Sequence, residues 1–396
     1  MSEVKRLGEK YLQHMINLRE TIHMYPEDGF SEFTTSKIII EELEKLGIKV
    51  QKNVAKTGVV GLIEGKYPGK TVLLRADMDA LKIQEQADVE YKSKIDGMMH
   101  ACGHDGHVAG LLGAAMILNE LKDNLHGNVK LVFQPAEERD GGALPMIEEG
   151  VLENPKVDAA MAMHVNSGTP SNLVVCGLGT SIGGCNRFRI VVKGTGCHGA
   201  MPETGVDPIF IANQIYSAIQ EITNREIVAT QPVVITIGKF VGGDAPNIIP
   251  GEVIMEGTIR TLDKEVGEYV FKRMGEIVTA TAKMLRGEAE LIELSSVPPL
   301  ANNKDLATEV TGYVKDIVGE QGVFLFEGGG MGSEDFASYS YEVPSLYLIL
   351  GAGAKNENPL YGEPMHNTKV VFNEDVLVTG AAIHTYSAIT WLKNHK

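Results

Sequence analysis

The chain has 396 residues, of which 43% are hydrophobic and 22% charged, and this composition excludes wholesale disorder and fibrous repeats. Its length predicts two domains rather than one. Acidic residues outnumber basic ones, 52 against 36, for a net charge of −16, and no lysine- and arginine-rich block occurs, so we expect neither nucleic acid nor membrane as a partner.

The N-terminus is polar, and nowhere do 18 uncharged apolar residues follow one another. We therefore expect no signal peptide, no membrane span and a cytoplasmic location. The four cysteines, Cys102, Cys176, Cys185 and Cys197, are too few for a disulfide framework, so we expect them to be reduced.

The first part of the chain alternates helices and strands. Apolar residues at helical spacing predict one helix that ends before Pro26 and a second from about Glu32 to Gly47. The next expected elements are strands at 59–63, 71–76, 129–133 and 159–165, with helices at 107–121 and just before Gly150. Because these strands are apolar on both faces, we expect a mixed or parallel sheet covered on two sides, in an α/β domain.

After Gly183-Gly184 the order of elements changes to β-α-β-β-α-β. The expected elements are 187–192, 208–223, 233–241, 253–261, 264–285 and 289–294. This order is typical of a ferredoxin-like domain that folds alone, so we interpret it as an insertion. A helix at 306–317, strands at 323–326 and 345–350 and a final helix at 373–392 then complete the first domain. The predicted divisions are 1–185, 186–296 and 297–396.

The densest polar cluster is Met99-His-Ala-Cys-Gly-His-Asp-Gly-His107. Cys102 and His104, hinged on Gly103, can turn toward one point, and a thiolate with an imidazole is a ligand pair suited to zinc or another transition metal. The alternative is a loop whose histidines cap a helix, with Asp105 as the N-cap. We expect His107 to be structural.

Polar residues that follow buried strands complete the candidate site. Glu137 and Glu138 project in opposite directions if extended, so one could coordinate metal while the other faces a water; an acidic helix start explains them equally well. His164 ends an apolar strand, at the sheet edge where α/β proteins bind ligands. His164 and His366 each have a purely structural alternative.

Other catalytic motifs are missing or incomplete. The G-x-G-x-x-G pattern at 194–199 is not followed by a helix, and the phosphate-loop resemblance at 64–71 lacks its first glycine. Neither G-x-S-x-G nor H-E-x-x-H occurs, which disfavours serine hydrolases and zincins.

Seven segments in order resemble the M20 metallopeptidase family, and within it the branch of hippurate hydrolase, N-acyl-amino-acid amidohydrolases and auxin-conjugate hydrolases. They are Leu74-Arg-Ala-Asp-Met-Asp79, 99–107, Phe133-Gln-Pro-Ala-Glu-Glu138, His198-Gly-Ala-Met-Pro202, Asn247-Ile-Ile-Pro250, Gly332-Ser-Glu-Asp-Phe336 and His366. The resemblance implies a zinc-peptidase-like α/β catalytic domain with a mixed sheet, interrupted by a ferredoxin-like lid that dimerises. A homodimer is therefore expected.

The resemblance also implies a centre of two divalent metal ions, zinc or manganese. Its ligands would be Cys102, His104, Glu138, His164 and His366. Glu137 would be the general base that takes a proton from a metal-bound water and passes one to the leaving amine. Asp77 would orient a ligand, and so would Asp105.

From the lid, the resemblance implies that His198 reaches the neighbouring subunit's active site and stabilises the oxyanion. Asn247 and Arg260 would hold the amino-acid carboxylate, although Arg260 could equally be an exposed strand arginine. The chain departs from the family motif at Cys197, where glycine is usual, and at Glu203, where histidine is usual.

Together with these residues, the resemblance implies a metal-dependent amidohydrolase that cleaves the amide bond of small-molecule N-acyl amino acids, such as acetyl or benzoyl conjugates. One alternative is a dipeptidase or aminopeptidase acting on small peptides. Another is a noncatalytic metal-binding member of the family.

Overall fold

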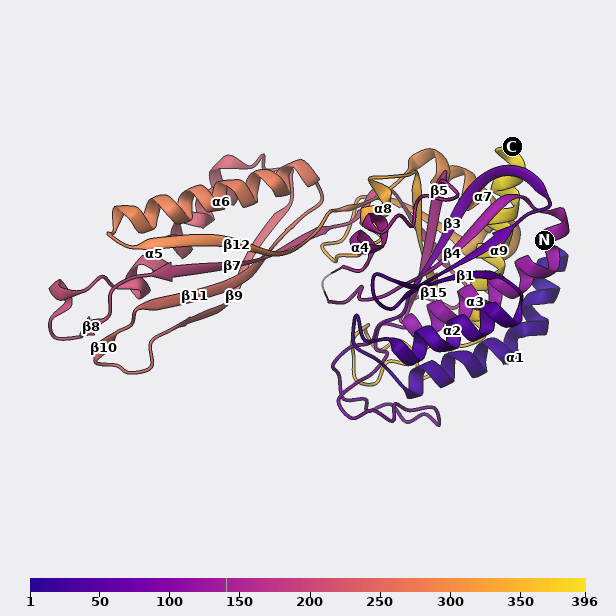
Figure 1. Cartoon of the computed structure of the whole chain (residues 1–396), viewed down its shortest axis with the longest axis horizontal. Coiled ribbons are helices and arrows are strands. Elements are labelled where there is room, and N and C mark those ends of the chain that lie inside the picture. Colours follow the sequence, from indigo (N-terminus) through magenta and orange to yellow (C-terminus); the bar gives the residue numbers. More distant parts are fainter. Residues whose placement is uncertain (140) are drawn as a thin grey trace. The chain divides into compact units, whose positions relative to one another are not determined.

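The large sheet and the helices that cover it confirm the predicted α/β class. The computed structural model describes residues 1–139 and 141–396. It forms two compact units, the first comprising Met1–Gly179, Ala301–Gly328 and Ser338–Lys396, the second Thr180–Leu300 and Gly329–Ala337 (Figure 1). The domain boundaries expected after residues 185 and 296 stay a prediction.

The large sheet has nine strands among the described residues and is mixed. In order across the sheet they are β1 (Lys49–Val54), β2 (Gly58–Glu64), β4 (His126–Gln134), β3 (Tyr67–Asp77), β5 (Ala159–Asn166), β15 (Ser345–Gly351), β6 (Val174–Ile182) and β13 (Leu300–Asn302), with β14 (Val323–Glu327) paired to β6. The central strands β4, β3, β5 and β15 run parallel, whereas β1 and β2 are antiparallel. Sequence analysis did not predict β1, β6 and β13.

Helices pack on this sheet through apolar side chains. Those of the first unit are α1 (Ser2–Met24), α2 (Phe33–Lys45), α3 (His104–Leu121), α4 (Ala143–Glu148), α7 (Lys304–Val318) and α9 (Val376–Asn394), and α8 (Ala337–Ser340) begins at the last residue of the second unit. Helices α1, α3 and α9 contact one another, and α3 is buried almost along its whole length. Gly113 permits this packing, because a Cβ there would lie 2.1 Å from the Met15 sulfur. No helix in the described part of the chain meets the length and hydropathy needed to cross a bilayer.

The second unit has the β-α-β-β-α-β order expected from the sequence. Its elements are β7 (Gly184–Lys193), α5 (Pro208–Glu221), β9 (Val233–Gly242), β11 (Glu252–Thr261), α6 (Lys264–Met284) and β12 (Glu288–Val297), and the strand order is β12-β7-β11-β9. The two helices contact each other and bury a separate apolar core against the sheet (Figure 1). Two short strands, β8 (Cys197–His198) and β10 (Ile248–Ile249), pair outside this sheet.

One edge of the large sheet gathers polar residues. The neighbouring strands β4, β3 and β5 are parallel, and Asp77 at the end of β3 is in register with Gln134 at the end of β4. Because their carboxyl ends meet at the same edge, the residues that follow them lie close together. Helix α3 begins at this edge too, with His104 as its first residue.

Candidate metal centre

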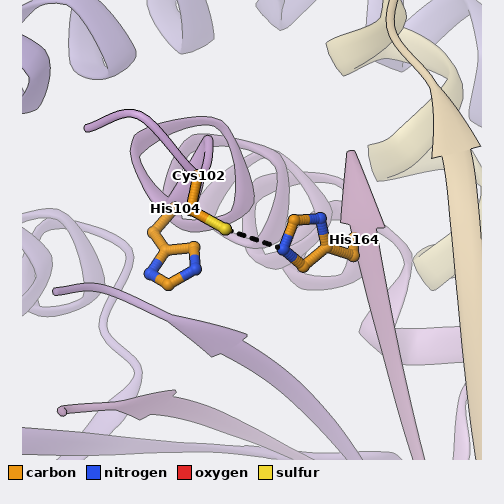
Figure 2. A group of neighbouring side chains, drawn as sticks. All are labelled: Cys102, His104 and His164. Carbon is orange, nitrogen blue, oxygen red and sulfur yellow. Dashed lines mark hydrogen bonds between the residues drawn. The ribbon is translucent and has the colours of Figure 1, made fainter. Parts of the chain in front are cut away.

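Cys102, His104 and His164 converge on one point in the first unit (Figure 2). One potential ligand atom from each lies within 4.8 Å of the others. Cys102 Sγ is 3.4 Å from His164 Nε2. Cys102 precedes α3, His104 starts it, and His164 comes from β5, so the sheet edge and the helix start together place these side chains.

Cys102 also belongs to a second group of ligands, with Glu138 and His366. His366 Nε2 lies 3.3 Å from Cys102 Sγ and 3.1 Å from Glu138 Oε1. His366 has a φ of 65°, a left-handed conformation that is uncommon for histidine, and its amide donates to the Ala101 carbonyl. The thiol sulfur of Cys102 is the one ligand atom that belongs to both groups.

The histidine nitrogens fit a divalent metal. His104 Nδ1 faces the Asp79 carbonyl at 2.9 Å and its carboxylate at 3.1 Å, whereas the buried Nε2 makes no hydrogen bond. His164 Nδ1 donates to the Val165 carbonyl, which leaves Nε2 toward Cys102. In both rings Nδ1 is held by the protein and Nε2 would be the nitrogen offered to a metal, the arrangement that oriented histidine ligands use.

Acidic neighbours shift the pKa values of His104 and Cys102, whereas burial dominates at His164. Burial disfavours the charged form of His104, but Asp77 and Asp79 overcome this effect and raise its pKa to about 10. Burial, together with Glu138 and Glu137, raises the pKa of the Cys102 thiol well above its usual range. Burial lowers the pKa of His164 to about 3, so this ring is neutral. A cation would replace the proton on His104 and stabilise the Cys102 thiolate.

Glu137 lies beside these ligands. A carboxylate oxygen of Glu137, one of Glu138 and a ring nitrogen of His104 lie within 4.8 Å of one another. The two glutamates follow β4 and are half-buried, and the next helix in the described part of the chain, α4, begins only at Ala143, so an acidic helix start is wrong for Glu137 and Glu138. Asp140, the third acidic residue of that alternative, lies outside the described residues. This arrangement leaves Glu138 in the ligand group with His366 and places Glu137 next to it.

Asp79 is a supporting residue whose role sequence analysis missed. Its carboxylate contacts His104 Nδ1 and also accepts the Glu138 amide at 2.9 Å, so it orients two candidate ligands at once. The Asp-Met-Asp segment was the available signal, but the role was assigned to Asp77. Asp77 also lies near this ligand, with an oxygen 3.7 Å from His104 Nε2, and its carboxylate pairs more closely with Arg75 at 2.6 Å and with His107.

Asp105 and His107 have structural partners. Gly103, and not Asp105, is the N-cap of α3, and it makes no side-chain cap. The Asp105 carboxylate contacts Arg19 at 2.9 Å and His23 at 2.8 Å, so the structure gives it a role different from the ligand-orienting one expected. His107 Nδ1 faces Asp77 and its Nε2 accepts the Val165 amide, so both nitrogens have protein partners.

The remaining predicted site residues belong to the second unit. His198 is exposed, and its Nδ1 accepts the Ala200 amide at 3.0 Å, which places the ring proton on Nε2 as a free donor. Asn247 precedes β10, which pairs with β8 so that Ile248 is opposite His198. Arg260, on β11, is half-buried and donates to the Met331 carbonyl at 2.7 Å, so it is not simply an exposed strand arginine.

Comparison with known proteins identifies close relatives. A model of peptidase family M20/M25/M40 matches residues 73–389. Thermostable carboxypeptidase 2 of Saccharolobus solfataricus is 42% identical over 378 residues, which cover 95% of this chain and 94% of that protein. IAA-amino acid hydrolase ILR1-like 2 of Arabidopsis thaliana is 40% identical over 96% of this chain and 85% of its own length. The structure of Bacillus subtilis YXEP, a dinuclear metal binding peptidase, matches with a TM-score of 0.80 at 31% identity and covers 97% of this chain and 99% of that one.

Proposed function

This chain belongs to peptidase family M20/M25/M40 and is a hydrolase of that family, and on this premise we propose that it cleaves the amide bond between an acyl group and an amino acid. The observation that carries the proposal is the position of Cys102, which lies in two ligand groups, with Glu137 beside the shared centre.

Two divalent ions would be held at this centre. Cys102, His104 and His164 would hold one, and Cys102, Glu138 and His366 the other. Thiolate and imidazole ligands favour zinc, while carboxylates also accept manganese, so either metal suits this donor set. When bound, such ions lower the pKa of a water and polarise an amide carbonyl.

The chain's own residues would move protons and orient the substrate. Glu137 would take a proton from the attacking water and pass one to the departing amine, which must leave as a neutral or protonated group. His198, with its proton on Nε2, would donate to the oxyanion that develops on the amide oxygen. Arg260 and Asn247 would hold the carboxylate of the amino acid.

The names of the relatives support this choice of substrate. A carboxypeptidase and an amino acid hydrolase both release an amino acid that carries a free carboxylate. A dipeptidase or aminopeptidase would instead need to accept a free amine on the other side of the bond. A noncatalytic metal site would not need Glu137.

An activity panel tests the proposal. Acetyl- and benzoyl-amino acids, N-blocked dipeptides and free dipeptides would be compared in the presence of zinc or manganese, with release of the amino acid as the measurement. We expect hydrolysis of the N-acylated substrates. Cleavage of free dipeptides alone would favour the dipeptidase or aminopeptidase, and no hydrolysis with a filled metal centre would favour a binding protein.

A further inference from the structure

Glu32, just before α2, is a buried carboxylate for which the described residues provide no positively charged partner. The residue has 0% exposure, and its two oxygens accept the Ala136 amide at 2.9 Å and the Thr57 hydroxyl at 2.6 Å. Burial raises its pKa despite these hydrogen bonds. A carboxyl group kept in such surroundings costs folding free energy, so its contacts call for an explanation beyond stability.

The Ala136 amide lies in a turn of unusual conformation. Ala136 directly precedes Glu137 and has a φ of 54°, in the left-handed region that residues with a Cβ avoid. The turn is also packed tightly, because a Cβ on Gly29 would lie 2.9 Å from the Ala136 Cβ. Such strained backbone persists only where neighbouring groups hold it.

The amides on both sides of Glu137 are held by carboxylates from distant segments. The Ala136 amide donates to Glu32, and the Glu138 amide donates to Asp79 at 2.9 Å. Asp79 also contacts the candidate ligand His104, whereas Glu32 contacts none of the candidate ligands described above. The hydrogen bond to the Ala136 amide is its direct contact with the turn, and its charge also acts on Asp79, whose carboxylate helps to raise the pKa of Glu32.

We propose that Glu32 is a positioning residue for Glu137. The Glu32 carboxylate fixes the Ala136 amide, and the turn held in this way directs the Glu137 carboxylate toward the attacking water. The inference rests on the proposed function. It requires an acceptor at this position, and it does not require a charge. Glutamine would still accept the Ala136 amide and donate to Thr57, whereas methionine cannot accept, and aspartate is too short by about one C–C bond of 1.5 Å.

The test compares E32Q, E32M and E32D in the full-length, metal-loaded protein. The control is E42L, which removes another buried carboxylate of the same region, one that pairs with His14 and Lys45 and makes no contact with the turn. Three quantities are measured: amide hydrogen exchange of the peptide spanning 134–138, kcat and KM on an N-acyl amino acid, and bound metal per chain.

We expect E32M and E32D to speed exchange of the Ala136 amide and to lower kcat by about 10- to 100-fold, with KM and metal content within about twofold of the wild type. E32Q should stay close to the wild type in all three, and E42L should keep its kcat. If E32M does not fold, E32D against E32Q gives the same comparison.

Unchanged exchange at Ala136 in E32M or E32D would overturn the proposal, as would a loss of kcat in E32Q as large as that in E32M. An equal loss in E42L would show a general effect of lower stability. A wild-type protein that cleaves no substrate of the panel would refute the proposed function instead, and the exchange measurement would still show whether Glu32 holds the turn.

Discussion

Glu137 and Glu138 are adjacent in sequence, yet the structure places them in different surroundings. Glu138 is paired with His366, while Glu137 lies beside the ligands. We expect Glu137→Gln to keep its metal and to lose about 10²- to 10⁴-fold in kcat, because an amide cannot take the proton of the attacking water. Metal analysis and steady-state kinetics on the same sample check this. Near-normal turnover would show that another base is at work.

The thiol of Cys102 is the atom common to both ligand groups. Cys102→Ala should therefore weaken the binding of both metal ions. His164→Ala and His366→Ala should each leave about one bound ion per chain, because each of these histidines belongs to a single ligand group. Elemental analysis after dialysis at a fixed free zinc concentration gives the stoichiometry. Two equivalents retained by Cys102→Ala would remove the thiol from the ligand set.

At the scale of single residues, candidate metal ligands could be predicted from the sequence, but the residues that orient them could not. Residue type and spacing indicate Cys102 and His104 as a candidate ligand pair, because few other side chains bind transition metals, whereas Glu138 is indicated as a ligand only by the resemblance to the M20 family. The role of Asp79 depends on the distance between β3 and the segment after β4, which no pattern within either segment contains. The partners of Asp105 lie on α1, more than eighty residues earlier.

At the scale of elements, the start of α3 is fixed to α1 by a buried ion pair. Arg19 and Asp105 are both buried and lie 2.9 Å apart. Burial opposes ionisation of Asp105, but Arg19 and His23 hold its pKa well below the ordinary value. Arg19→Met should destabilise the fold by about 3–5 kcal/mol, because it leaves a buried carboxylate without its main partner.

Denaturant unfolding measures that change. Arg6→Met is the matched control on the same helix, since Arg6 pairs with Glu3 in an exposed position and its loss should leave the midpoint unchanged. Equal midpoints for Arg19→Met and Arg6→Met would show that the buried pair does not hold α3 in place.

Helices and strands were predicted correctly where the residue pattern within the segment itself indicates the element. The strands β3, β4 and β5 each contain a short, mainly apolar run, and α5 and α6 show helical spacing, so local patterns were sufficient to predict these elements. The strand β6 contains Gly177 and Gly179, which weaken strand propensity, and it is ordered by pairing with β14 and β15. Those partners lie more than 140 residues away in sequence.

At the scale of the whole molecule, the candidate residues are divided between two units. The metal ligands and Glu137 belong to the first unit, and His198, Asn247 and Arg260 belong to the second. The second unit is continuous in sequence over Thr180–Leu300 and has its own apolar core. A unit of this kind can supply its residues either to its own chain or to a partner.

If the protein is a homodimer and His198 acts in the partner's active site, complementation will reveal it. Neither His198→Ala nor Glu137→Gln should be active alone. In a mixed dimer, one site combines Glu137 of the His198→Ala chain with His198 of the Glu137→Gln chain and is intact. The other site lacks both side chains. Random exchange of equal amounts should therefore restore about one quarter of the wild-type activity, because half of the dimers are mixed and each has one intact site.

The measurement is turnover after subunit exchange, with size-exclusion chromatography of differently tagged chains to establish that mixed dimers have formed. Each variant exchanged with itself is the control, and it should stay inactive. If His198 served its own chain, both sites of a mixed dimer would carry one defect, and no activity would return. Activity near one quarter with mixed dimers present therefore requires His198 and Glu137 of one site to come from different chains.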